Sequence, residues 1–334
     1  MRISKKKSAI WGICLLASLA FAGAACAAPT YFTIASPPSS AAFYTYWVAV
    51  GKVMESAYPD FKVSVSESQG AIDIAKKIRT KMAALGNGQS DADYANYYGT
   101  DFFQDKPFAY ARVLWYYDKV STQFIVAQDS GIRTLQELEG QKFNPGGTGM
   151  SLAIFTRGVF EELGIKPVFF EASQASASDA LVNRQIIGTA KNGIGTGADS
   201  YVVQILANIP VTLISLRNEE IEKIVARYPY CTPTTIKAGI YQGIDYDVNT
   251  VGQMESAVAS TALSQEDAYK IISAMNTEEG KKIWESAYPS AKAVDMLELT
   301  LQSKVPLHAG TVQYLKERGY DVPGHLIPPE YEAR

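Results

Sequence analysis

Four turns rich in glycine or serine each follow a predicted strand and open a predicted helix. They span residues 36–44 (SPPSSAAFY), 67–72 (ESQGAI), 144–151 (NPGGTGMS) and 192–199 (NGIGTGAD). Since parallel strands end at one edge of a sheet, we expect these turns to meet at that edge, where ligands bind in α/β proteins. Free N–H groups at a helix start carry roughly half a positive charge and can hold a carboxylate, sulfonate or phosphate without an arginine. The turns therefore predict a site for a small anion.

Two other uses of these turns compete with anion binding. Any one of them also fits an ordinary strand-to-helix connection in which glycine allows tight geometry. Nucleotide binding is disfavoured, because the third turn lacks the GK[ST] ending of a phosphate loop and the glycines at 193, 195 and 197 do not complete a GxGxxG pattern. Four such turns, spread over both halves of the chain, favour a ligand site.

Residues suited to catalysis are few. His308 and His325 are the only histidines, and the sequence contains no G-x-S-x-G elbow. Cys231 is the one cysteine after residue 27, and it has no evident histidine or basic partner in the sequence. No CxxC pair or His/Cys cluster indicates a metal. We therefore expect no enzymatic activity, no cofactor and no metal.

Acidic residues form two short groups. Asp91 and Asp93 make the first, and Glu219, Glu220 and Glu222 make the second. Either group could supply paired catalytic acids. Charged residues in a turn or on a solvated helix face are far commoner, and we interpret both groups in that way.

Tyrosine is abundant, with 20 residues, and several lie near the predicted loops, including Tyr44, Tyr98 and Tyr241. A tyrosine offers an apolar ring and one hydroxyl, which suits a cleft that closes on a small polar ligand. Ordinary packing in the core and on the surface accounts for many of the others.

The first 27 residues have the pattern of a cleavable signal peptide. Basic residues at positions 2 and 5–7 precede an apolar run that ends in Ala25-Cys26-Ala27, an A-x-A-like cleavage site. Lipid anchoring at Cys26 is a weaker alternative. No later stretch has the roughly 18 consecutive apolar residues of a membrane span. We therefore expect a periplasmic protein.

The charge of the chain is acidic. The formal net charge is −3, and it becomes −7 without the four basic residues of the signal segment. An acidic protein is a poor candidate for nucleic-acid binding, and we expect none. Backbone amides can still make one pocket locally positive, so a small anionic ligand remains compatible with this charge.

Short apolar runs alternate with longer amphipathic stretches, which predicts an α/β protein with mostly parallel sheet flanked by helices. The expected strands span 31–35, 61–66, 93–97, 168–170, 186–190 and 211–215, with another near 141. The expected helices span 42–58, 71–85, 151–163, 178–183, 200–208, 266–275, 278–287 and 311–318. Two extended stretches, 120–128 and 250–263, separate two successive α/β units.

This order predicts two lobes joined by a hinge. We expect lobe 1 to contain residues 28–124 and 249–334, because the helical tail returns to the first unit, and lobe 2 to contain residues 125–248. A segment that is entered and left by two extended strands is a common hinge design. The protein is expected to be a monomer.

Several stretches together resemble one family, the TAXI subfamily of solute receptors of tripartite ATP-independent periplasmic (TRAP) transporters. The most specific stretches are Tyr228-Pro229-Tyr230, the run 236–245 (IKAGIYQGID) and the run 247–251 (DVNTV). They are similar to the family's "YPYY", "IPAGTYPGQ" and "DVPTV". The run 129–142 (DSGIRTLQELEGQK) is similar to "DSGIKSLADLKGKRV", and the turn at 146–149 with 161–165 fits "GPPGSGT … LEALGI".

The first two loops depart from the family pattern. The family's first loop reads like GTGSTGGTYY, and here residues 35–44 read ASPPSSAAFY. The second, typically TGGSVENL, is SQGAIDI at 68–74, and the aspartate of the family's GKIDAFF is replaced by Gly188. The resemblance is therefore stronger in the scaffold than in the pocket.

The resemblance implies a two-lobed, type II-like periplasmic binding protein. Such a receptor captures a small organic anion, such as a dicarboxylate or an acidic amino acid, and passes it to the membrane permease subunits of a TRAP transporter. A ligand-sensing receptor for a sensor kinase and a periplasmic enzyme acting on an acidic metabolite are the alternatives. The expected ligand-binding residues are Ser36, Ser39, Ser40, Phe43, Tyr44, Gln69, Gly70 and Tyr98 in lobe 1, Gly147, Thr148, Gly149 and Ser151 in lobe 2, and Gly195, Thr196 and Tyr241 at the rim.

Overall fold

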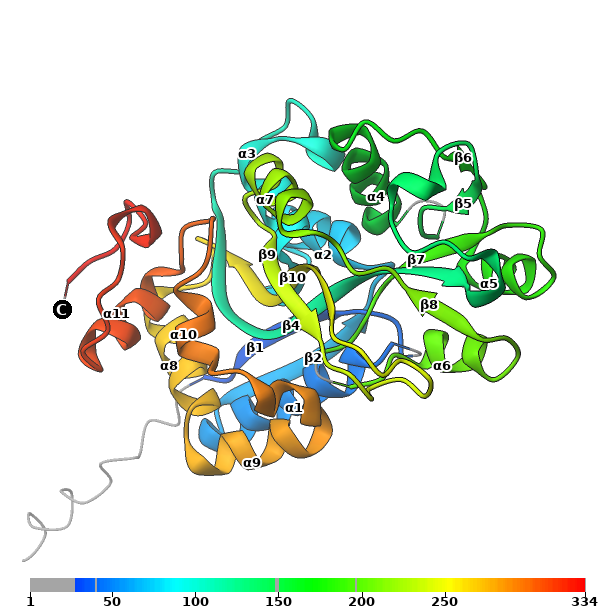
Figure 1. The fold of residues 1–334 in the computed structure, drawn as a ribbon. Coiled ribbons are helices and arrows are strands. Elements are labelled where there is room, and N and C mark those ends of the chain that lie inside the picture. Colours follow the sequence, from blue (N-terminus) through cyan, green and yellow to red (C-terminus); the bar gives the residue numbers. More distant parts are fainter. Residues whose placement is uncertain (1–27, 40, 148–149, 196, 334) are drawn as a thin grey trace, which may run out of the picture.

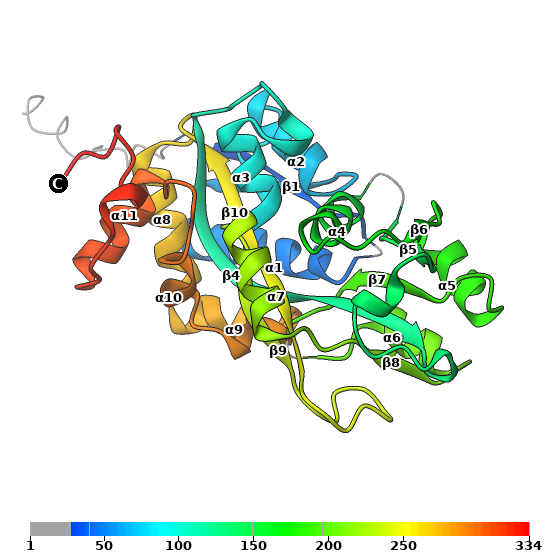
Figure 2. The ribbon, with the colours of Figure 1, turned by 45° about the horizontal axis from the view of Figure 1, so that its top comes forward.

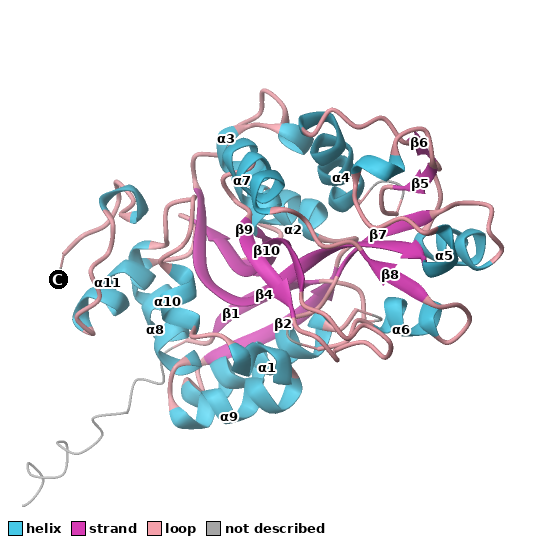
Figure 3. Cartoon of the chain, in the orientation of Figure 1, coloured by secondary structure: helices cyan, strands magenta, loops and turns pink. Residues whose placement is uncertain are grey.

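The computed structural model describes residues 28–39, 41–147, 150–195 and 197–333. In this part of the chain ten strands form one continuous sheet in the order β2-β1-β3-β10-β4-β7-β5-β6, with β8 paired to β4 and β9 paired to β10. Helices pack around the sheet (Figure 3). The protein is therefore α/β, as the alternation of the sequence predicts.

We call the part of the fold around the parallel strands β2, β1 and β3 lobe 1. Its first elements are β1 (Thr30–Ser36), α1 (Phe43–Ala57), β2 (Phe61–Glu67), α2 (Ala71–Arg79), β3 (Leu85–Gln89), α3 (Ser90–Tyr98) and the 3₁₀ turn η1 (Asp101–Phe103). The C-terminal part of the chain adds α8 (Gln265–Met275), α9 (Glu278–Ala287), η4 (Pro289–Ala293), α10 (Met296–Thr300), α11 (Ala309–Glu317) and η5 (Gly324–Leu326).

Lobe 2 is built around β7, β5 and β6, which are also parallel. Its elements are η2 (Gln128–Ser130), η3 (Gln136–Leu138), β5 (Lys142–Asn144), α4 (Ser151–Glu162), β6 (Val168–Phe169), α5 (Gln174–Val182), β7 (Gly188–Asn192), α6 (Ser200–Leu206), β8 (Val211–Leu213), α7 (Asn218–Arg227) and β9 (Thr232–Ile236). In Figure 1, α4, α5, α6 and β5 to β8 lie toward the right, and the orange and red helices of lobe 1 lie toward the left.

Two long antiparallel strands, β4 (Ala111–Ala127) and β10 (Val248–Ser260), run through both lobes and lie side by side (Figure 2). Up to Ser121, β4 pairs with β10, and from Thr122 onward it pairs with β7 and β8. Strand β10 pairs with β3 in lobe 1 and with β9 in lobe 2. The two expected crossing strands are thus confirmed.

Each lobe has its own hydrophobic core. The core of lobe 1 combines residues 32–117 with residues 254–326, and it includes Trp47, Trp115 and Trp284. Lobe 2 has two clusters, one around Phe124, Phe143 and Phe160 and one on the other side of the sheet. The C-terminal helices therefore pack into the same hydrophobic core as β1, β2 and β3.

One expected strand is wrong. Residues 93–97 lie inside helix α3, and the third strand is β3, which follows the earlier end of α2 at Arg79. The sequence of β3 is LGNGQ, which has no β-branched or aromatic residue. Its glycines are required by packing, since a Cβ at Gly86 would overlap the carbonyl oxygen of Ala35, and one at Gly88 would overlap the side chains of Asp93 and Ser256. Tertiary packing, rather than propensity, specifies this strand.

Among the described residues, no helix combines the length and the apolar composition that crossing a bilayer requires.

Candidate functional site

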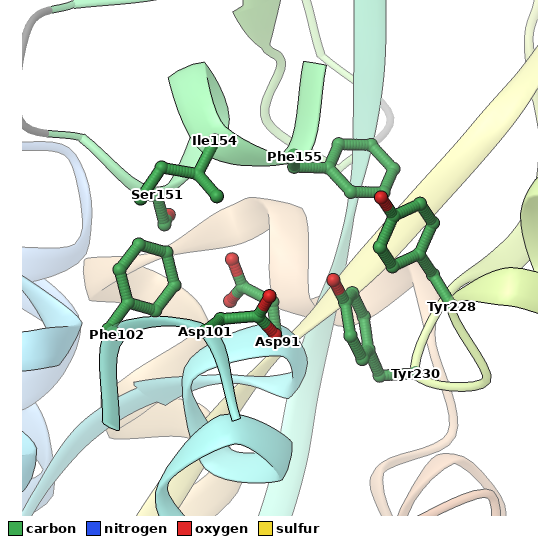
Figure 4. A pocket seen from close by; sticks show the side chains of 8 residues that line it. All are labelled: Asp91, Asp101, Phe102, Ser151, Ile154, Phe155, Tyr228 and Tyr230. Atoms are coloured by element: carbon green, nitrogen blue, oxygen red, sulfur yellow. The ribbon is translucent and has the colours of Figure 1, made fainter. Parts of the chain in front are cut away.

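A small cavity lies between the lobes (Figure 4). Lobe 1 contributes the start of α3 and η1, and lobe 2 contributes the first turn of α4 and the turn between α7 and β9. Its volume of about 20 Å³ is enough for roughly one water-sized group. The residues that line it are Asp91, Asp101, Phe102, Ser151, Ile154, Phe155, Tyr228 and Tyr230.

Local structure places each of these side chains. Ser151, Ile154 and Phe155 share one face of α4, because residues three and four positions apart are neighbours on a helix. Asp101 adopts a positive φ of 45° after the left-handed Gly99, which turns η1 back over α3. Tyr228 and Tyr230 flank a proline in the turn before β9.

Asp91 is the buried charge of this cavity. Its side chain is 3% exposed, and its Oδ1 accepts a 2.7 Å hydrogen bond from the N–H of Ala92. Its Oδ2 has no hydrogen-bond partner among the described residues. Burial raises the pKa of Asp91 to about 6, although the Ala92 N–H and the Ser151 hydroxyl partly offset this effect.

Three further buried carboxyl groups lie next to this region, on α3, β4 and β10. Burial raises the pKa of Asp93 well above its usual range, although its Oδ2 accepts a 2.6 Å hydrogen bond from Ser256. Burial also raises the pKa of Glu255 to about 8 and the pKa of Asp118 to about 6. The region next to the cavity therefore holds several carboxyl groups whose burial favours the protonated, uncharged form.

Aromatic rings enclose the other side of the cavity. The ring of Phe155 lies 5.2 Å from that of Tyr228 and 6.4 Å from that of Tyr230. Tyr230 also contacts Tyr94 of α3, with ring centroids 5.6 Å apart, which joins the two lobes. In Figure 4 the hydroxyl of Tyr230 and the carboxylates of Asp91 and Asp101 point toward the same space.

The structure brings only part of the expected site to this region. Ser151 lines the cavity. Gly195 lies against lobe 1, where a Cβ would overlap the side chain of Ser290 and approach Asp118. Gly147 is buried in the turn before α4. Ser40, Thr148, Gly149 and Thr196 lie outside the described residues.

Other expected residues are placed in the cores. Tyr241 is 1% exposed, and its hydroxyl bonds with the Gln123 side chain and accepts from the N–H of Asp199 at 3.0 Å. Phe43 packs against Tyr117 and Tyr288 in lobe 1. Ser36 is fully buried, and its hydroxyl donates to the carbonyl oxygen of Pro37.

The remaining expected residues lie nearer the surface of lobe 1. Ser39 and Gln69 are exposed, and Tyr44 and Gly70 are half-buried. Tyr98 is 48% exposed, and its hydroxyl donates to the carbonyl oxygen of Lys304 at 3.1 Å. These residues do not line the cavity.

Sequence reasoning missed the acidic side of the site. The interpretation of Asp91 and Asp93 as solvated was wrong, since both are buried in α3. Glu220 is also buried, where it accepts hydrogen bonds from the backbone of Arg217 and from Gln136, so it caps α7 and joins lobe 2 elements. The available signal was Tyr228-Pro229-Tyr230, which stood out as a motif but not as part of the pocket.

The donor set does not indicate a metal centre. Within the described ranges, no three histidine, cysteine, aspartate or glutamate side chains are grouped so that they could hold an ion. Cys231 is buried and not in a disulfide, and burial raises the pKa of its thiol well above the usual value. Lys191 lies 3.5 Å from Asp199 and is paired within lobe 2.

Several solved structures are similar to this chain at low sequence identity. The alkanesulfonate-binding protein SsuA from Xanthomonas axonopodis pv. citri, bound to MOPS, is 12% identical, with 90% of this chain and 97% of that chain covered and a TM-score of 0.44. MatC from Rhodopseudomonas palustris, with bound malate, is 13% identical, with 79% and 89% covered and a TM-score of 0.49. The periplasmic aliphatic sulphonate binding protein SsuA from Escherichia coli is 13% identical, with 92% and 95% covered and a TM-score of 0.47.

None of these structures superimposes closely on this chain. The family comparison is more direct, because one family model covers most of the chain. The model described as the NMT1-like family matches residues 34–319. The chain therefore belongs to the NMT1-like family.

Proposed function

We propose that this protein is a periplasmic solute receptor that closes its two lobes on a small organic acid. The observation that carries the proposal is the cavity between two separately packed lobes, which the long strands β4 and β10 connect. A ligand that contacts both α3 and α4 would stabilise the closed form, because closure is favoured only by contacts to both lobes.

The first turn of α4 is the proposed contact for an acidic group. This helix has 12 residues, and no side chain caps its N-terminus. Its first N–H groups can therefore donate hydrogen bonds to a carboxylate or sulfonate. Helix α6 is a weaker candidate, because the Asp199 side chain already accepts from the N–H of Tyr201.

The hinge and the partner are part of the same proposal. We place the lobe boundaries at 124/125 and 248/249, close to where β4 changes partners from β10 to β7 and β8. The TAXI resemblance supports delivery of the ligand to TRAP permease subunits by a monomeric receptor exported through the signal segment.

A thermal-shift and calorimetry screen tests this function. Purified protein without residues 1–27 is titrated with organic acids, sulfonates, amino acids, sugars and simple cations. A true ligand binds once per chain, is recovered unchanged, and stabilises the fold by about 2.7 kcal/mol at 100 times its dissociation constant. Small-angle scattering should then show a more compact particle. Turnover of the ligand, or responses to sugars alone, would contradict the proposal.

A further inference from the structure

The cavity between the lobes holds an incompletely paired carboxylate. Asp91 lines the cavity and is only 3% exposed. Among the described residues, its Oδ2 has no hydrogen-bond partner. A buried acceptor without a donor is costly, and a charged one more so. A donor that enters the cavity would remove this cost, and a positively charged donor would remove most of it.

The charges around Asp91 favour a cation over a second anion. Asp101 lies at the same cavity, and no lysine, arginine or histidine is among the lining residues. The start of α4 supplies only roughly half a positive charge, so two lining carboxylates leave the cavity with an excess of negative charge.

The aromatic lining fits the same group. Phe155, Tyr228 and Tyr230 present three rings within 6.4 Å of one another, centroid to centroid. Ring faces attract a cation within about 6 Å of their centroids, and more strongly where water is excluded. Phe102 adds a fourth ring from lobe 1. Carboxylates on one side and rings on the other form a site suited to a cationic nitrogen.

The size of the cavity selects among cationic groups. About 20 Å³ holds roughly one water-sized group. A primary ammonium has about the dimensions of a water molecule and three N–H donors. A trimethylammonium group is several times larger and fits only if the lobes move apart.

We propose that the cavity between α3 and α4 is a subsite for the primary ammonium group of the ligand, with Asp91 as its main acceptor, Asp101 at its mouth and Tyr230 as an additional acceptor. The proposal rests on the receptor function above and extends it: the organic acid also carries a primary amine. Its acidic group lies at the first N–H groups of α4, and its ammonium group lies beside them against α3.

The test uses matched pairs of compounds with the protein lacking residues 1–27. A series of α-amino and ω-amino acids is compared with the corresponding acids without the amine and with the N-trimethylated forms. We expect at least one primary amine to raise the unfolding temperature by about 5 °C near saturation. Its partner without the amine and its trimethylated form should bind at least roughly tenfold more weakly.

Two variants separate this subsite from a structural role. Asp91→Asn keeps the shape of the side chain, and we expect it to weaken binding of the amine at least roughly tenfold while the variant without ligand unfolds at an equal or higher temperature. Asp105→Asn is the matched control, since Asp105 is exposed in the same segment, outside the cavity, and asparagine tolerates its positive φ of 57°. The control should bind like the wild type.

The outcomes distinguish the subsite from the receptor function. If acids without an amine bind as tightly as their amino partners, or if Asp91→Asn binds the amine like the wild type, the ammonium subsite is wrong and the receptor function stands. If no acid of either kind binds, both proposals fail.

Discussion

The hydroxyl of Ser90 in α3 donates a 3.0 Å hydrogen bond to the carbonyl oxygen of Tyr230. The hydroxyl oxygen of Ser90 also accepts a 3.1 Å hydrogen bond from the N–H of Met254 in β10. One buried hydroxyl thus fixes the start of α3 to the turn that carries the cavity tyrosines and to a crossing strand. The geometry of the cavity depends on this junction.

We expect Ser90→Ala to lower the free energy of unfolding by about 1–3 kcal/mol, because it leaves a buried carbonyl and a buried N–H without their partner. Urea denaturation measures the change. Ser286→Ala is the control: Ser286 is exposed in α9 and bonds only to the carbonyl of Lys282 in its own helix, so the change should stay within about 0.5 kcal/mol. Equal changes in the free energy of unfolding of the two variants would show that the hydrogen bonds of Ser90 do not stabilise the fold more than those of an exposed serine.

Gly195 offers a test of closure. The loop before α6 meets lobe 1 at this residue, where φ is 24° and a Cβ would overlap the hydroxyl oxygen of Ser290 and press on Asp118. We expect Gly195→Ala to hold the lobes apart, so that ligand affinity falls while each core remains folded. Scattering would show a larger radius of gyration than in the wild type.

Gly197→Ala is the matched control for this substitution. Among the described residues, a Cβ at Gly197 meets the Ile194 side chain at 3.7 Å, which is an ordinary contact. This variant should close and bind like the wild type. If Gly195→Ala also closes and binds normally, the contact between this loop and lobe 1 does not govern closure.

Glu255 predicts a dependence of stability on pH. Its carboxyl is buried and accepts from Asn87 at 3.0 Å and Gln89 at 2.7 Å, and its pKa is raised to about 8 from 4.5. Between these pH values the folded state holds a proton that the unfolded state has lost, so stability falls as pH rises. From pH 6.5 to pH 8 the loss from this group should be about 1.5 kcal/mol.

This pH range separates Glu255 from His308. Burial lowers the pKa of His308 to about 4 from 6.5, so its effect on stability is confined to pH values below about 6.5, and it has the opposite sign. Asp93, whose pKa is also raised, contributes in the same direction as Glu255. Denaturation at pH 6.5 and 8 should therefore show a smaller loss in Glu255→Gln than in the wild type, and an unchanged loss would refute the assignment.

Tyr241 distinguishes a core residue from a ligand contact. Its hydroxyl joins Gln123 of β4 to the backbone of Asp199 at the start of α6. We expect Tyr241→Phe to cost about 1–3 kcal/mol of stability, because buried partners lose a hydrogen bond, while the affinity for ligand stays the same. Calorimetry at a temperature well below the midpoint of unfolding measures the affinity. A large loss of ligand affinity would show that Tyr241 contacts the ligand.

The sequence alone determined most of the fold. The period of the apolar residues identified α1, α4, α8 and α9 to within a few residues, and the two extended stretches identified β4 and β10. These elements bury strongly patterned faces, so their type follows from local sequence. The glycines Gly86 and Gly88 remove that signal from β3, so the sequence predicts the strand at Asp93, inside α3, eight residues after its true start at Leu85.

Only the tertiary structure decided where the charges lie. Asp91 lies in a polar stretch of sequence, and its neighbours in the chain give no sign that α4 and the Tyr228–Tyr230 turn cover it. Burial depends on elements that are distant in sequence, and the same burial sets the pKa of the carboxyl and leaves one of its oxygens unpaired. Glycine-rich turns are recognisable in the sequence, whereas the carboxyl groups of Asp91 and Asp101 meet Ser151 of α4 only in the folded chain.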